Sequence, residues 1–390
     1  MPKPNDLNRF PVALDQDSTL IAVIEMSQSS WLVGGLVPGL EREPLKKLQP
    51  DAGLLVALLQ RWREEAGRCG RRLTRLAVAY EAGRDGFWLA RWLISRGIEA
   101  HVIHASSVAV SRTHRRAKTD RLDVALLKRS FLGWLRGEAD HCTMAPVPEL
   151  AVEDARRPGR ERAVLVGERT RIVNRMKAAL ARLGIRDFNP ALGKAPGRLA
   201  QLRTPEGVPV PAHTRAELER TMARLRLINQ QIREIETARL ERQQQASAGA
   251  GDAAEQVLAR VVGLAAGTAD LLSHELFVRT LRDRRAVARY GGLTGAPDES
   301  GRRRREKGLA RAGNARVRTA MIQFTWRFLR FQPASALAKW YHARTEETVG
   351  DRRGTRKRLI VALARKLLIA LWRLVTVGEV PDGVVLRPAV

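Results

Sequence analysis

The sequence has few cysteines and few histidines. Its two cysteines, Cys69 and Cys142, lie far apart, so neither a disulfide framework nor a structural zinc site is expected. The seven histidines do not follow the spacing of metal ligands. An architecture stabilised by disulfides or by zinc is therefore excluded.

A long uninterrupted hydrophobic run is also missing. The longest apolar stretch, residues 359–375, carries Arg365, Lys366 and Arg373, so it is typical of a buried amphipathic helix rather than of a membrane span. The first 17 residues are polar and contain proline, unlike a signal peptide. The sequence therefore predicts a cytoplasmic location and no membrane partner.

Acidic residues are scarce relative to basic ones. The 390 residues include 69 Lys and Arg against 41 Asp and Glu, which gives a formal net charge of +28. The excess is spread along the chain and predicts a polyanionic partner, DNA or RNA. A ribosome-like structural protein would share this charge, but the alternating strand and helix patterns over this length disfavour that class.

The first third of the chain alternates between strand and helix patterns. Four strands are expected from short apolar runs at residues 19–24, 30–37, 73–80 and 99–104. Helices are expected at 51–66, at 83–96 and from about residue 119 onward. The first two strands would form a hairpin. This order predicts an α/β domain over residues 18–144.

Two long charged helices follow this domain. Residues 160–183 and 214–245 carry apolar side chains at spacings of three and four, which predicts a coiled-coil or helical-hairpin arm. Residues 145–251 are thus predicted to hold a linker at 145–158 and this arm, with a Pro- and Gly-rich connector at 188–211 between its helices. Residues 252–390 are mostly helical, with a turn-rich loop at 291–301. The predicted fold class is thus α/β plus all-α, in three domains.

Four carboxylates stand where a metal site could form. Glu25 and Glu81 each follow a predicted strand, and ligand sites of open α/β sheets form at the carboxyl edge. Asp120 and Asp123 open the next helix on one face. Converging carboxylates could bind Mg²⁺ for phosphodiester chemistry. The alternatives are strand-end acids on a solvated rim and a helix with an acidic first turn, capped by Thr119 or Asp120.

Basic residues accompany both candidate centres. Phosphate contacts beside the two aspartates are expected from Arg115, Arg116 and Lys118. Ser300 lies in the turn-rich loop before a basic stretch and is a candidate nucleophile, although the sequence shows no His–Asp partner to activate it. The alternative is a turn serine beside a solvated basic stretch. Nucleic-acid contacts in this region are expected from Arg302, Arg303, Arg304, Arg305, Lys307, Asn314, Arg316 and Arg318.

Together these blocks resemble the DEDD transposases of the insertion sequence 110 family, which are related to the Piv/MooV DNA invertases. The most specific block is residues 118–123, which match the family motif Lys-Thr-Asp-x-x-Asp. Residues 80–83 correspond to a glutamate–glycine segment of the family. The C-terminal blocks follow the family's order, namely the turn at Gly263 and residues 290–294, 299–301 and 312–318.

The resemblance implies a RuvC/RNase H-like N-terminal domain, a coiled-coil arm and a mostly helical transposase domain. It implies a DNA transposase or recombinase that transfers phosphodiester bonds with a serine nucleophile, assisted by Mg²⁺ at the four acids. It also implies a structured guide RNA and a homodimer or homotetramer. The chain departs from the family pattern at Glu25, which replaces Asp, and at Ala265 and Gly295, which replace Gly and Pro.

Two other interpretations stay open at this point. One is a RuvC-like, Mg²⁺-dependent nuclease or resolvase that hydrolyses DNA without a covalent step. The other is an inactive nucleic-acid-binding relic, which the replacement at Glu25 would favour. Within the covalent mechanism, Tyr290 and Tyr341 are rival nucleophiles.

The charge predicts steep salt dependence of DNA binding. If about 6 to 10 phosphates are neutralised, affinity should fall roughly 10³- to 10⁵-fold between about 50 and 200 mM salt, because bound counterions are released. Fluorescence anisotropy with labelled DNA measures this slope. A flat response would contradict the electrostatic interpretation.

Overall fold

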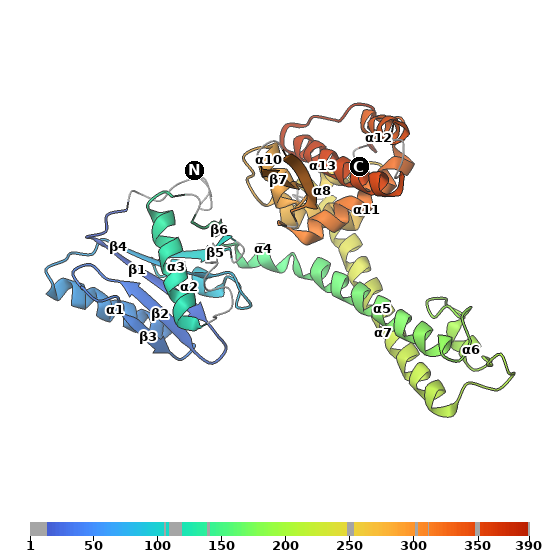
Figure 1. Ribbon diagram of the computed structural model, residues 1–390, viewed down its shortest axis with the longest axis horizontal. Coiled ribbons are helices and arrows are strands. Elements are labelled where there is room, and N and C mark those ends of the chain that lie inside the picture. Colours follow the sequence, from blue (N-terminus) through green and yellow to red (C-terminus); the bar gives the residue numbers. More distant parts are fainter. Residues whose placement is uncertain are drawn as a thin grey trace. The chain divides into compact units, whose positions relative to one another are not determined.

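The computed structural model describes residues 14–104, 107–108, 119–138, 141–247, 253–300, 303–310, 312–347 and 352–388. The chain forms two compact units, Met1–Ala151 and Val152–Val390. The first unit combines a sheet with helices, and the second is mostly helical (Figure 1). Both the predicted arm and the predicted C-terminal helices belong to the second unit.

A six-stranded sheet forms the centre of the first unit, in the order β3-β2-β1-β4-β5-β6. Its strands are β1 (Thr19–Met26), β2 (Trp31–Leu36), β3 (Leu45–Leu48), β4 (Arg75–Glu81), β5 (Glu99–Ile103) and β6 (Met144–Ala145). β1, β4 and β5 are parallel, and the other pairs are antiparallel. The four predicted strands and the first hairpin are confirmed. The sequence did not reveal β3 or β6, because the first is mostly exposed and the second has two residues.

Helices cover both faces of this sheet. They are α1 (Ala52–Arg68), α2 (Trp88–Ile94) and α3 (Asp120–Leu135), and Figure 1 shows α3 crossing in front of the strands. Side chains of a strand alternate between faces. Accordingly, Leu20 and Ile24 of β1 pack with α1 and α2, whereas Ile21 and Val23 pack with α3. The alternation decides which residues of each strand face α3.

Two neighbouring glycines of β2 allow the helices to approach closely. A Cβ atom on Gly35 would lie 2.7 Å from the Trp62 ring of α1, and one on Gly34 would lie 2.5 Å from Val124 of α3. Because successive residues of a strand face opposite sides of the sheet, Gly35 makes room for α1 and Gly34 makes room for α3. A larger residue at either position would force the facing side chain of the helix to shift.

The second unit begins with an antiparallel helical hairpin. Its long helices are α5 (Arg157–Ala181) and α7 (Ala212–Ser247), which lie side by side in Figure 1. The first half of α5 packs with the middle of α7 in one apolar cluster, and the end of α5 packs with the first part of α7 in another. The predicted arm is therefore confirmed as a hairpin within one chain. A short helix, α6 (Ala195–Leu199), lies in the segment that the sequence predicted to be a connector.

Helices and one small sheet complete the second unit. The helices are α8 (Ala253–Ala259), α9 (Ala266–Leu272), the π-helix η3 (Ser273–Phe277), α10 (Arg284–Tyr290), α11 (Ala315–Phe331), α12 (Ala336–Glu346) and α13 (Arg352–Val377). They share one large core, to which α11 contributes Phe324 and Phe328 and α13 contributes Leu363 and Leu368. Along the described residues, no helix is long and apolar enough to cross a membrane.

The predicted loop at residues 291–301 was wrong. Strand β7 (Gly295–Ser300) pairs antiparallel with β8 (Arg303–Leu309) as a two-stranded hairpin. Glycine and proline normally mark loops, and here Gly295 and Pro297 flank an irregularity in the strand pairing. One further short helix, α4 (Leu150–Asp154), lies in the segment that was predicted to be a linker.

The close approach at Gly35 can be tested by substitution. Gly35→Ala should destabilise the protein by about 1–3 kcal/mol, because the new methyl group overpacks the Trp62 ring. Gly67→Ala in α1 is the matched control, since its Cβ meets no atom within 4 Å, and it should stabilise by about 0.5–1 kcal/mol. Urea unfolding followed by circular dichroism measures both. Equal stability of the two variants would contradict the packing at β2.

Candidate active site

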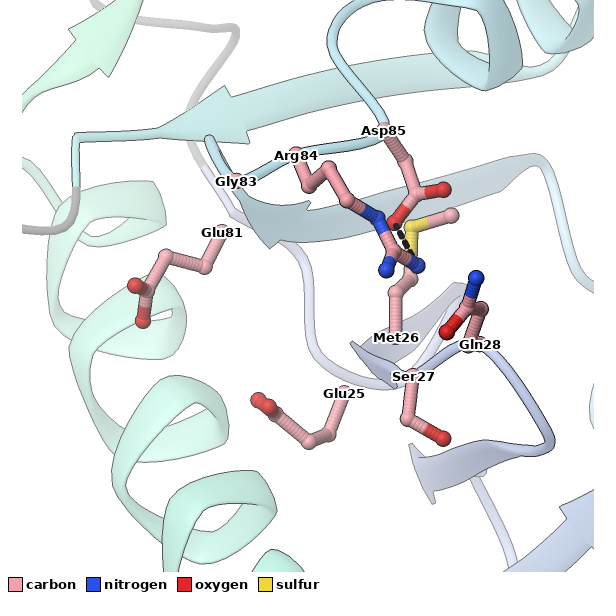
Figure 2. A pocket seen from close by; sticks show the side chains of 8 residues that line it. All are labelled: Glu25, Met26, Ser27, Gln28, Glu81, Gly83, Arg84 and Asp85. Carbon is pink, nitrogen blue, oxygen red and sulfur yellow. Dashed lines mark ion pairs between the residues drawn. The ribbon is translucent and has the colours of Figure 1, made fainter. Parts of the chain in front are cut away.

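The carboxyl edge of the central sheet brings two glutamates together. β1 and β4 are parallel neighbours whose register pairs Ile24 with Tyr80, so the next positions, Glu25 and Glu81, lie beside each other. Adjacent strands are about 4.8 Å apart. The residues two positions earlier in both strands pack with α3, so both glutamates lie on that face. Figure 2 shows the two carboxylates directed to the same side, toward the pale green helix.

The two glutamates line a pocket of about 330 Å³. The end of β1 and its turn contribute Met26, Ser27 and Gln28, and the segment after β4 contributes Gly83, Arg84 and Asp85 (Figure 2). Arg84 and Asp85 form an ion pair at 4.0 Å. Carboxylate, hydroxyl, amide and guanidinium groups therefore surround one cavity. The sequence prediction missed the residues beside the glutamates, although each group directly follows a predicted strand-end acid.

The turn after β1 holds its pocket residues in place. The Ser27 amide donates to the Ser30 carbonyl at 3.0 Å, and the Ser27 hydroxyl donates to the same carbonyl at 2.7 Å. The Ser30 amide in turn donates to the Ser27 hydroxyl at 3.1 Å. A short turn closed at both ends by hydrogen bonds fixes the end of β1, and hence the position of Glu25.

Asp120 and Asp123 occupy the first turn of α3. The Thr119 hydroxyl accepts a hydrogen bond from the Leu122 amide at 3.3 Å, so Thr119 is the N-cap and the alternative cap at Asp120 is excluded. Asp120 precedes Val124 by four residues, and Val124 packs on the sheet, so Asp120 extends the sheet-facing side of the helix by one turn. Asp120 is exposed and Asp123 is half-buried.

The structure brings two of the four predicted ligands into one pocket. Asp120 and Asp123 do not line the pocket of Glu25 and Glu81. Within the described residues, no three Asp, Glu, His or Cys side chains are grouped closely enough to hold a metal ion. The four-carboxylate Mg²⁺ site therefore stays a prediction. Arg115, Arg116 and Lys118, predicted beside it, lie outside the described residues.

Ser300 is the last residue of β7, in the second unit. Its backbone pairs with Arg303 across the hairpin, and Glu299 pairs with Arg304. Arg305 and Lys307 belong to the same strand, β8, whereas Arg302 lies outside the described residues. The predicted serine and four of the predicted basic residues thus share one β-hairpin.

The two ends of the segment that carries this hairpin are joined by a hydrogen bond, and this junction is the base of the hairpin. The backbone N–H of Asn314 donates to the Tyr290 carbonyl at 2.6 Å, which joins the end of α10 to the start of α11. Gly313 has a φ of +88°, and a Cβ atom there would collide with the Arg289 carbonyl. Only glycine fits this turn without strain. Residues 291–313 therefore begin and end at one fixed point.

Buried Glu275 of η3 organises that fixed point. Its carboxylate accepts from Arg160 Nε of α5 at 3.0 Å and from Asn314 Nδ2 at 3.2 Å. The Tyr290 hydroxyl donates to the Glu275 carbonyl at 2.7 Å and accepts from Asn314 Nδ2 at 3.1 Å. These bonds link the arm, η3, α10 and α11. The sequence prediction missed Glu275 and Arg160, which lie far from the hairpin in the chain.

The Asn314 side chain is fully used within the protein. Its Oδ1 caps α11 by accepting from the amides of Arg316 at 3.0 Å and Val317 at 3.3 Å, while Nδ2 makes the two bonds above. An amide offers two donors and one oxygen with two lone pairs, so all four positions are filled. The predicted nucleic-acid contact of Asn314 stays a prediction and would have to replace one of these bonds. Arg316 is exposed and Arg318 is half-buried.

His274 and Arg156 lie beside the hydrogen-bonded group of Glu275, Tyr290 and Asn314. Arg156 Nε donates to the His274 carbonyl at 2.9 Å. The hydrogen bond that the His274 ring donates to the Asp270 carboxylate raises the pKa of His274, and burial lowers the pKa of Arg156. Arg156, His274 and Asp270 line a small cavity at the junction of α5 with α9 and η3. These polar groups hold the base of the arm to the helical core.

Each of the three tyrosines of the chain is either buried or has its hydroxyl hydrogen-bonded within the protein. Tyr80 and Tyr341 are 1% and 2% exposed, respectively. The Tyr290 hydroxyl is occupied by Glu275 and Asn314. A DNA phosphate could not reach any of these hydroxyls without local rearrangement, which disfavours the two tyrosines that rival Ser300.

Two similarities to known proteins complete the description. The pattern of the family "Transposase IS116/IS110/IS902 family" matches residues 255–341, from α8 to α12. The chain is also 38% identical over 393 residues to "Putative transposase y4rJ" of Sinorhizobium fredii (strain NBRC 101917 / NGR234), covering 98% of both chains.

The chain belongs to the IS116/IS110/IS902 transposase family. The transposase is thus an insertion-sequence protein that transposes DNA, and DNA is its substrate. The matched segment contains Glu275, Tyr290, Ser300 and Asn314, so the hairpin and its base lie within the family pattern. The acidic edge of the central sheet lies outside that segment, in the region covered by the likeness to the Sinorhizobium protein.

The base of the hairpin predicts a charge-specific effect at Asn314. Asn314→Asp keeps an oxygen that caps α11 but places a second carboxylate about 3 Å from that of Glu275. Asn314→Ser keeps a cap without the charge. At neutral pH the Asp variant should be less stable than the Ser variant by about 1–3 kcal/mol, since both lose the Nδ2 donor but only Asp adds a second negative charge beside the Glu275 carboxylate. Urea unfolding measures the free energy of unfolding of both variants. An Asp variant as stable as the Ser variant would contradict the contact between Asn314 and the Glu275 carboxylate.

Proposed function

We propose that this transposase cuts and rejoins DNA with Ser300 as a covalent nucleophile, assisted by an acidic site of Glu25, Glu81, Asp120 and Asp123. The observation that carries the acidic half is the placement of two glutamates side by side on parallel strands, in one polar pocket. The family likeness and the position of Ser300 on a hairpin followed by arginines support the serine half.

The strand arrangement supports a RuvC-like N-terminal domain. An antiparallel β1–β2–β3 meander continues into parallel β4 and β5, and acids end both β1 and β4. A helix, α3, covers the face on which these acids lie and begins with two aspartates. This combination is typical of nucleases that use carboxylates at one edge of a sheet.

The donor set fits magnesium. Mg²⁺ prefers oxygen ligands and is often held by one or two carboxylates together with water and substrate phosphate. Glu25 and Glu81 supply two carboxylates to one pocket, and Asp120 and Asp123 stand on the helix facing that side. When bound, the ion would stabilise charge on the phosphate and on the leaving oxygen. Glu25 in place of the family's Asp retains the ligand type with one more methylene group.

The serine step conserves phosphodiester bonds. Ser300 Oγ forms a bond to the DNA phosphorus while the bond from phosphorus to a deoxyribose oxygen breaks, and the serine proton passes to that leaving oxygen. Attack by another DNA hydroxyl then restores a DNA phosphodiester and returns the proton to Ser300. Arginines of β8, with Arg302, would hold the phosphate.

Assembly and guidance belong to the same proposal. We infer that the transposase acts as a homodimer or homotetramer with a structured guide RNA. The arm supports assembly, because Leu227 and Leu240 of α7 stay 54% and 49% exposed after the hairpin has formed its own core. The net charge of +28 supports binding of a second nucleic acid beside DNA.

Substitution of the serine tests the proposal. Ser300→Ala should bind DNA within about twofold of wild type yet form no covalent protein–DNA adduct, since phosphate contacts supply most of the affinity. Denaturing electrophoresis detects the adduct, and peptide mapping of the wild-type adduct identifies its residue. Ser300→Cys is the control that keeps a nucleophile of similar shape.

Two outcomes would refute Ser300 as the nucleophile. Strand exchange that persists in Ser300→Ala, or an adduct mapped to Tyr290 or Tyr341, would exclude the serine. Mg²⁺-dependent hydrolysis without any adduct would favour the nuclease or resolvase. Absence of all cleavage by the wild-type protein on its own element ends would favour the inactive relic.

A further inference from the structure

The carboxyl-terminal end of α11 exposes two large aromatic side chains. Trp326 and Phe331 are each 45% exposed, whereas Phe324 and Phe328 of the same helix are 1% exposed and belong to the core. Exposing this much ring to water costs free energy unless a ligand covers it. The two rings are separated by about 140° of helical rotation, and Arg330 and Arg327 lie between them, at about 40° and 100° from Trp326.

Arginines surround both rings. Arg356 of α13 lies over the Trp326 ring, with its Cζ 5.6 Å from the ring centroid. Arg327 and Arg330 lie 5.5 Å and 5.6 Å from the Phe331 ring. Arg327 Nε also donates to the Gly263 carbonyl at 3.0 Å, which fixes this corner of the surface. The aromatic and cationic groups therefore come from two helices and form one patch.

The charge of these helices has one sign. α11 contains four arginines and α13 contains eight Lys or Arg, and neither helix contains Asp or Glu. An isolated cluster of this kind repels itself unless an anionic partner neutralises it. Exposed aromatic rings among arginines are the arrangement that binds single-stranded nucleic acid, because unpaired bases stack on the rings while phosphates meet the cations.

We propose that Trp326, Phe331, Arg327, Arg330 and Arg356 form a stacking platform for unpaired bases of a DNA strand. A duplex hides the faces of its bases, so the aromatic rings favour a single strand. DNA is the occupant because it is the substrate of the transposase, and exchange of strands exposes unpaired bases. The platform does not depend on the serine or metal assignments.

The rest of α11 connects the platform to the hairpin. Arg316, Thr319 and Gln323 are exposed and share the side of the helix that carries Trp326. From Arg316 to Trp326 the helix rises by roughly 15 Å. The helix begins shortly after β8. A DNA strand bound at the β-hairpin could therefore follow this polar side of α11 to the platform.

Binding of matched oligonucleotides tests the platform. Trp326→Ala should weaken binding of a single-stranded DNA oligonucleotide roughly 5- to 100-fold, because stacking on one base is lost. Binding of an abasic oligonucleotide of equal length, and of a duplex, should stay within about twofold, since neither offers an unpaired base to the ring. Trp326→Phe should retain most of the affinity. Fluorescence anisotropy at one fixed salt concentration measures the affinity of each variant for the single-stranded, abasic and duplex ligands.

Arginine variants of α13 provide the charge control. Arg356→Gln should weaken binding of the single-stranded and the abasic oligonucleotide alike, because it removes a phosphate contact. Arg373→Gln lies on the same helix, but Arg373 is paired with Glu379 at 2.9 Å, so this variant should bind both oligonucleotides as wild type does. Equal losses for the two arginines would overturn the location of the platform.

Three outcomes would overturn the proposal. The first is unchanged binding of single-stranded DNA by Trp326→Ala. The second is an equal loss for the single-stranded, abasic and duplex ligands while thermal unfolding is unchanged, which would make the effect one of charge or shape. The third is a loss confined to an RNA oligonucleotide of the same sequence, which would assign the surface to RNA. A loss for the DNA strand supports the platform whether or not RNA binding also falls.

Discussion

The parallel pairing of β1 with β4 is the constraint on which the candidate active site depends. Its register places Glu25 and Glu81 beside each other, and strand alternation puts both on the side of α3. A slip of one residue would turn one carboxylate to the opposite face, against α1 and α2. The buried residues of both strands prevent this slip, because every apolar side chain would change sides as well. Core packing and site geometry are therefore set by the same register.

The second unit depends on a comparable constraint at Glu275. Glu275 joins the arm to the two helices that carry the β-hairpin. Its carboxylate accepts from Arg160 and Asn314, and its main-chain carbonyl accepts from Tyr290. A buried charge is costly unless it is paired and hydrogen-bonded, so these partners act as a unit. The consequence is a fixed base for residues 291–313, with Ser300 at the end of β7. The family pattern covers this frame, and the aromatic patch of α11 begins on the same helix that Asn314 caps.

Much of the fold could be predicted from periodicity. Continuous apolar runs predicted the central strands, and spacings of three and four predicted the arm. β3 was missed because the exposed Leu-Lys-Lys-Leu run has no apolar pattern, and the hairpin at Ser300 was mistaken for a loop because it contains Gly295 and Pro297. Both errors arise where pairing with a neighbouring strand, rather than local composition, determines the backbone.

The candidate site was predictable only in part. Strand-end acids are visible in a sequence, so Glu25 and Glu81 were found, whereas Ser27, Gln28 and Arg84 join the pocket through turns whose course composition does not reveal. Glu275 could not be found, because its partner Arg160 lies 115 residues away in the chain.

The most direct test of the acidic site is metal-directed cleavage of the protein itself. Fe²⁺ bound in place of Mg²⁺ and supplied with hydrogen peroxide and ascorbate generates hydroxyl radicals that cut the backbone close to the ion, and mass spectrometry maps the cuts. The account predicts cuts near Glu25, Glu81 and the start of α3, all suppressed by excess Mg²⁺ and lost together in Glu81→Gln. Cuts confined to other segments, or cuts near Glu25 that persist in Glu81→Gln, would contradict a shared carboxylate site.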